Sequence, residues 1–71
     1  MSSFDFEIWL STSVDLETDN KNALGQWLKS NQIVTKGSLL GLNDGDMNDL
    51  SIGIRSALRV AISIFKGKNY Y

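Results

Sequence analysis

The 71-residue chain contains no cysteine, no histidine and no proline. Without cysteine, disulfides and thiolate zinc sites are excluded, and without histidine there is no imidazole for catalysis. Proline is a common signal that stops a helix, so its absence fits an all-helical chain. Stability must therefore come from a hydrophobic core, for which the 42% of hydrophobic residues provide the material.

The chain also lacks an apolar stretch long enough to cross a membrane, and its acidic N-terminal part does not resemble a signal peptide. We therefore expect no membrane association and a cytoplasmic or nuclear location. The net charge is only −1, which argues against a dedicated nucleic-acid binder because such proteins usually carry a basic excess.

The charges that are present are segregated along the chain. Residues 1–20 carry acidic side chains and no basic one, whereas residues 50–71 carry basic side chains and no acidic one. The acids are Asp5, Glu7, Asp15, Glu17 and Asp19, and the bases are Arg55, Arg59, Lys66 and Lys68. This order favours complementary surface patches, although solvated charged faces are the simpler explanation.

Apolar residues at helical spacing predict two helices in the first half of the chain. Phe6, Trp9 and Leu10 can share one buried face of a helix that begins after Ser2 or Ser3.

The polar segment 11–22 predicts a loop from which Val14 and Leu16 turn inward. A second helix is expected over about residues 20–30 and is expected to end at residues 31–32. Its apolar positions are Leu24, Trp27 and Leu28.

Two short helical turns are predicted next. Ser38 is expected to cap a turn that carries Leu39, Leu40 and Leu42. Asn43 or Asp44 is expected to cap the following turn, with Asp46 in its first turn and with Met47 and Leu50 facing inward.

The last predicted helix is the longest, beginning after Ser51 and ending at Phe65 or Lys66, with Gly67 as a suitable residue beyond its end. Its core face combines Ile54, Leu58, Ala61 and Phe65 with the flanking residues Ala57, Ile62 and Ile64. A basic ridge of Arg55, Arg59 and Lys66 follows one edge of that face.

These elements predict an all-α fold, a compact five-helix bundle with a long C-terminal helix. We expect residues 4–67 to form a single domain, with residues 1–3 and 68–71 as flexible ends.

The order of these elements and several residues within them resemble the sterile alpha motif (SAM) domain. The matching residues are Trp9-Leu10 at the end of the first helix, Leu24 and Leu28 followed by Asn31 and Ile33, Gly37 with Leu39-Leu40 and Leu42, Asp46-Met47 with Leu50-Ser51-Ile52, and Arg55 or Arg59 in the last helix. The segment 11–23 is longer than in most SAM domains and is similar to that of the fungal adaptors that link kinases in MAP-kinase signalling.

The resemblance implies a protein-interaction module that binds other SAM domains head to tail. By position, the acidic surface would comprise Asn43, Asp44, Asp46, Asn48 and Asp49. The basic surface would comprise Gly53, Arg55, Ser56 and Arg59. The implied partner is another SAM-like domain, either a second copy or part of a signalling protein such as a kinase.

The residues support three other functions less well. RNA or DNA binding by the basic ridge of the last helix is the alternative, but four bases on an acidic chain are a weak footprint. The elbow 43–49 does not match a calcium-binding EF-hand loop, because Asp49 stands at the required glycine and Arg55 at the required glutamate. No catalytic residues, metal site or cofactor motif are evident, so we expect no enzyme activity and no cofactor.

Overall fold

The computed structural model describes residues 4–67, and within them it contains helices and no strand. In chain order the elements are α1 (Phe6–Ser13), α2 (Thr18–Ser30), α3 (Lys36–Leu40), the 3-10 helix η1 (Asp44–Met47) and α4 (Ile52–Gly67). The predicted all-α class is confirmed. The described residues form four α-helices rather than five, because Asp44–Met47 winds as a short 3-10 helix. The flexible ends predicted at residues 1–3 and 68–71 lie outside the described residues.

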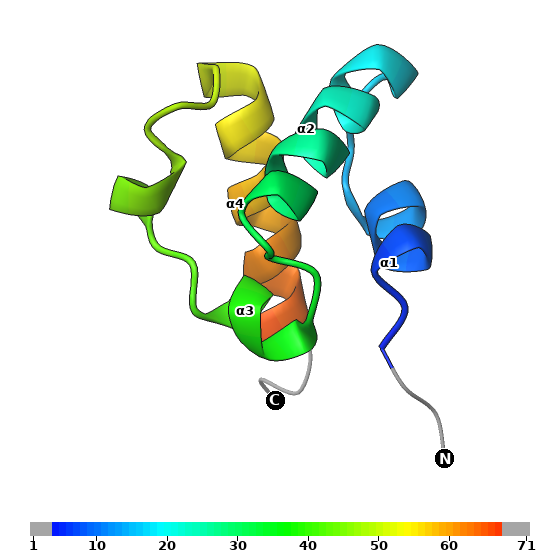
Figure 1. The fold of residues 1–71 in the computed structure, drawn as a ribbon, viewed down its shortest axis with the longest axis vertical. Helices are drawn as coiled ribbons and strands as arrows, with labels where there is room; N and C mark the ends of the chain where they lie inside the picture. The colour runs from blue at the N-terminus through cyan, green and yellow to red at the C-terminus, as the bar shows by residue number, and fades with distance from the viewer. Residues whose placement is uncertain (1–3, 68–71) are drawn as a thin grey trace.

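The long helix α4 runs through the middle of the molecule in Figure 1, with α1 on one side and the segment that carries η1 on the other. One hydrophobic core joins all five elements. Its buried members are Phe6, Trp9, Leu10, Val14, Leu24, Leu28, Leu39, Met47, Leu58, Ala61 and Ile62. The core is thus built mainly from residues that the helical spacing predicted.

The first helix begins where an acidic side chain caps it. One carboxylate oxygen of Asp5 accepts hydrogen bonds from the backbone N–H groups of Glu7 (3.0 Å) and Ile8 (3.2 Å). A carboxylate both satisfies these free donors and complements the positive end of the helix dipole. The N-cap is therefore Asp5, and the prediction of Ser2 or Ser3 was wrong.

The prediction of a loop over residues 11–22 is wrong for most of that segment. Only residues 14–17 separate α1 from α2, because α1 continues to Ser13 and α2 already begins at Thr18. Val14 anchors this connection in the core, with an exposed fraction of 3%. The Lys21 ammonium group also donates to the carbonyl of Ser11 (2.9 Å), which ties the first turn of α2 to the end of α1.

The short helix α3 is capped by Thr35 and not by Ser38 as predicted. The two residues form a capping box, in which the Ser38 N–H donates to Thr35 Oγ1 (3.2 Å) and the Thr35 N–H donates to Ser38 Oγ (3.0 Å). Ser38 therefore supplies the reciprocal half of the motif, three residues after the cap. Leu39, in the same helix α3, is completely buried.

The glycine in the middle of α2 allows α1 and α2 to approach closely. A Cβ atom on Gly25 would lie 2.9 Å from a terminal methyl carbon of Leu10, which is itself buried. Glycine weakens a helix by up to about 1 kcal/mol relative to alanine. The close approach to Leu10 is a structural reason for its presence.

The last helix begins at Ile52, directly after Ser51 as predicted. Its predicted end at Phe65 or Lys66 was wrong, because the helix includes Gly67. Its buried residues Leu58, Ala61 and Ile62 all belong to the predicted core face. Ile64 does not belong to it, since 63% of this side chain is exposed. Ile64 lies about 120° around the helix from Leu58, which places it beyond the packed face.

The end of α2, predicted at residues 31–32, is a Schellman motif. The Ile33 N–H donates to the Leu28 carbonyl (2.8 Å), and the Gln32 N–H donates to the Lys29 carbonyl (3.0 Å). Gln32 adopts a left-handed backbone with a φ of 61°, a conformation that glycine adopts at less cost than other residues.

We therefore predict that Gln32→Gly stabilises the protein by about 0.5–1 kcal/mol, because glycine relieves the left-handed strain. The measurement is the free energy of unfolding in urea, followed by far-UV circular dichroism. Gln26→Gly is the matched control, since Gln26 is exposed within the same helix, and it should destabilise by about 0.5–1 kcal/mol. Equal effects of both substitutions would contradict the explanation.

We also predict that Leu58→Ala destabilises the protein by about 2–5 kcal/mol, because it leaves a cavity in the centre of the core. Leu58 is fully buried, whereas Val60 on the same helix is 58% exposed. Val60→Ala should therefore change the free energy of unfolding by less than about 0.5 kcal/mol. A loss below about 1 kcal/mol for Leu58→Ala would show that this helix face is not central to the core.

Candidate protein-interaction surface

The residues predicted to form the acidic docking surface lie on η1 and on the turns around it. All of them, namely Asn43, Asp44, Asp46, Asn48 and Asp49, are exposed. The buried Met47 anchors this segment against the core. The segment therefore projects its polar side chains outward from a fixed backbone.

Asp46 has a structural role within that surface. One of its carboxylate oxygens accepts a hydrogen bond from the Asn43 N–H (3.2 Å), while its own N–H donates to the Asn43 carbonyl (3.0 Å). These reciprocal bonds close the 3-10 turn over three residues. Asn43, one of the two predicted caps, thus precedes the turn as its N-cap. Asp49 is different, because no ion pair or side-chain hydrogen bond holds it among residues 4–67.

The predicted basic surface lies on the first half of α4. Gly53, Ser56 and Arg59 are exposed there, and Arg55 is half-buried. Arg55 forms no ion pair within the described part of the chain. Its guanidinium group therefore keeps its hydrogen-bonding capacity for a ligand or for water.

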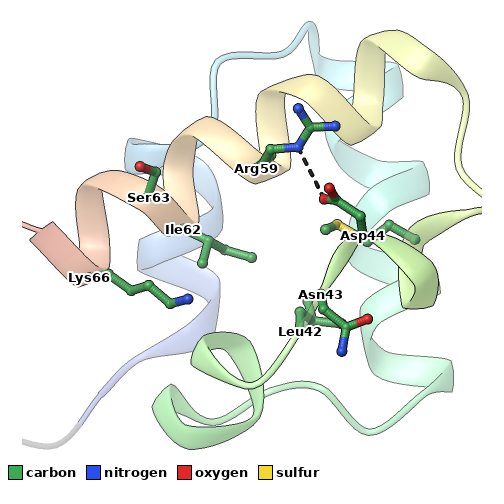
Figure 2. Close-up of a pocket in the computed structure, with 8 residues that line it drawn as sticks. Leu42, Asn43, Asp44, Arg59, Ile62, Ser63 and Lys66 are labelled. Carbon is green, nitrogen blue, oxygen red and sulfur yellow. Dashed lines mark ion pairs between the residues drawn. The ribbon is translucent and has the colours of Figure 1, made fainter.

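The structure connects the two predicted surfaces through one ion pair. Arg59 Nε lies 3.2 Å from a carboxylate oxygen of Asp44, although the residues are on different elements (Figure 2). Both side chains remain exposed, by 55% and 73% respectively. An exposed ion pair of this kind contributes little to stability because water and salt screen it. The pair nevertheless neutralises one charge from each surface.

A cavity of about 320 Å³ lies beside this ion pair, between η1 and α4 (Figure 2). Its lining residues are Leu42, Asn43, Asp44, Met47, Arg59, Ile62, Ser63 and Lys66. Five of them were not among the predicted site residues: Leu42, Met47, Ile62, Ser63 and Lys66. The helical ridge that groups Arg59 with Lys66 was a sequence signal for one of these five. No sequence pattern predicted that Leu42 would lie close to α4.

The described residues show neither a metal site nor a membrane span. No group of three or more acidic, histidine or cysteine side chains within residues 4–67 is placed to hold a metal ion. In the same part of the chain, no helix combines the length and the apolar character needed to cross a membrane. All charged side chains described are at least partly accessible to solvent, so the chemistry of the molecule lies on its surface.

No family model, no curated protein and no solved structure matches this chain. The evidence for a function therefore comes from the surface chemistry described above.

We predict that Asp44 and Arg59 are coupled by no more than about 1 kcal/mol, because both side chains are exposed. A double-mutant cycle with Asp44→Asn and Arg59→Gln, measured by urea unfolding, gives this coupling. The coupling should fall further when the salt concentration is raised. The Glu7–Lys29 pair, which is 2.7 Å long and similarly exposed, serves as the reference. A salt-independent coupling above about 2 kcal/mol would contradict the prediction.

Proposed function

We propose that this chain is a non-catalytic protein-interaction module that binds another SAM-like domain. The acidic surface on η1 of one molecule would contact the basic surface on α4 of the other. Four shorter elements before a long last helix support the SAM-like, five-helix interpretation when η1 is counted as a helix. The partner is a second copy or a SAM-like domain of a signalling protein such as a kinase.

The observation that carries the proposal is the presence of accessible, unpaired charges of opposite sign on two different elements. Asp49 follows η1, and Arg55 lies in the first half of α4. Neither forms an ion pair among the described residues. Complementary potentials of this kind accelerate encounter and set the orientation of two partners. Because the two surfaces differ, the contact is heterologous and either joins two molecules or continues into a filament.

The proposed setting is a signalling adaptor in the cytoplasm or nucleus, such as one in a MAP-kinase pathway. The resemblance to SAM domains of fungal adaptors supports this setting. The absence of cysteine agrees with a reducing compartment.

Nucleic-acid binding through Arg55, Arg59 and Lys66 is the weaker candidate. A protein that follows a nucleic-acid backbone needs several unpaired cations along one face. Here Asp44 already neutralises Arg59, and the net charge of the chain is −1. The ridge therefore presents a smaller positive potential than its sequence indicates.

We predict that Asp49→Lys and Arg55→Glu each block self-association, and that a mixture of the two variants forms a single dimer. Each variant loses one surface and retains the other, so the two intact surfaces can meet only once. Sedimentation velocity at two salt concentrations measures the association. These positions are preferred to Asp46 and Arg59, which also hold the η1 turn and the Asp44 ion pair.

The control for charge alone is Asp15→Lys, an exposed acid in the connection between α1 and α2. It should associate like the parent, and all variants should retain the helical circular dichroism spectrum. A mixture that stays monomeric while the parent associates would refute the two-surface contact. A parent that stays monomeric at millimolar concentration would refute pairing with a second copy.

A further inference from the structure

The cavity between η1 and α4 combines an apolar floor with a charged rim. Met47 and Ile62 form part of its lining with exposed fractions of 2% and 5%, and the half-buried Leu42 adds a third apolar side chain. Most of the apolar surface that an aliphatic group can cover therefore belongs to Leu42. The cavity is separate from Asp49 and Arg55, which are absent from its lining.

Two cations border the cavity along α4. Arg59 and Lys66 are seven residues apart, which places them on the same side of the helix and roughly 10 Å apart along its axis. Lys66 extends toward the cavity from the far end of the helix (Figure 2). It has no ion-pair partner among residues 4–67, whereas Arg59 is paired with Asp44. The charged rim is therefore positive overall.

We infer that this cavity is an open groove that binds an acidic segment of a partner protein. The segment carries one carboxylate on each side of an aliphatic side chain. One carboxylate takes the place of Asp44 at Arg59, the second contacts Lys66, and the aliphatic group packs against the apolar floor, chiefly against Leu42. An extended peptide advances about 3.3 Å per residue. Its side chains alternate between two sides, so residues i, i+2 and i+4 can face the groove together. Carboxylates four residues apart, with the aliphatic residue midway between them, span about 13 Å, a distance that the long side chains of Arg59 and Lys66 can cover.

Asp44 acts in this arrangement as an internal competitor for Arg59. Because the Asp44–Arg59 pair is solvent-exposed on both sides, its loss costs little and a partner carboxylate can replace it. Asp44 also disfavours a nucleic-acid strand, whose regularly spaced phosphates would be brought next to its carboxylate. The apolar floor further favours a peptide, since a phosphate backbone has no group to cover it.

The test uses the full chain and a fluorescein-labelled peptide, Gly-Asp-Ser-Leu-Ser-Glu-Gly, in a fluorescence anisotropy titration. Its counterpart with Asn and Gln in place of Asp and Glu should bind at least about tenfold more weakly, because it lacks both charges. Arg59→Gln and Lys66→Gln should each weaken binding of the acidic peptide by about fivefold or more. Asp44→Asn should strengthen it by about fivefold, because Arg59 is then unpaired.

The matched control is Lys29→Gln, which removes an exposed, ion-paired cation at the contact with Glu7, outside the cavity, and should leave peptide binding unchanged. The inference is overturned if Asp44→Asn weakens binding, if the amide peptide binds equally well, or if no binding occurs up to millimolar peptide. It is also overturned if an oligo-uridine binds more tightly than the peptide and loses affinity with the same substitutions.

The experiment separates this groove from the proposed pairing of SAM-like domains. Asp49→Lys and Arg55→Glu, which should block that pairing, leave the lining of the groove intact. Both should bind the acidic peptide like the parent. Loss of self-association with retained peptide binding supports the groove as an independent site, and loss of both activities in these variants overturns it.

Discussion

The structure depends on burying leucine side chains from three different helices against one another. Leu24 and Leu28 of α2, Leu39 of α3 and Leu58 of α4 are fully enclosed. Each such side chain contributes roughly 1.5–3 kcal/mol when it is removed from water. In a chain of this size without disulfides, the core must offset the loss of chain entropy. The orientation of every surface residue follows from how these leucines pack.

The packing of α4 decides what its two exposed edges face. With Leu58 and Ile62 buried, the edge that carries Arg59 and Lys66 is turned toward η1, where Asp44 lies. The same helix therefore carries the proposed docking surface at Arg55 and the groove at Lys66. A rotation of α4 by one residue, about 100°, would separate these charges.

The helical repeat in the sequence was sufficient to predict α1, α2 and α4 and most of the core. It did not predict the length of the first connection, because the buried Val14 and the Lys21–Ser11 contact shorten it. Ile64 was placed wrongly for a related reason. An apolar residue at the border of a helix face is buried only if a neighbouring element covers it, and no element within residues 4–67 covers Ile64.

The helix caps differ in how well they could be predicted from the sequence. Asn43 and Asp46 are three residues apart, and the bonds that join them could be predicted from their spacing. Thr35 and Ser38 have the same spacing and form the same reciprocal motif, but the prediction took Ser38 as the cap and not as the third residue after the cap. Asp5, and not Ser2 or Ser3, caps α1. Its negative charge also complements the positive end of the helix dipole.

By itself, the sequence determined the all-α class, the positions of the main helices and the order of acidic and basic segments. These properties depend on interactions within one or two helical turns. Only the tertiary structure decided that Asp44 meets Arg59, that Gly25 faces Leu10 and that a groove opens beside Lys66. Each of these contacts joins residues on different elements. Their geometry depends on the angles at which side chains from distant parts of the chain interlock.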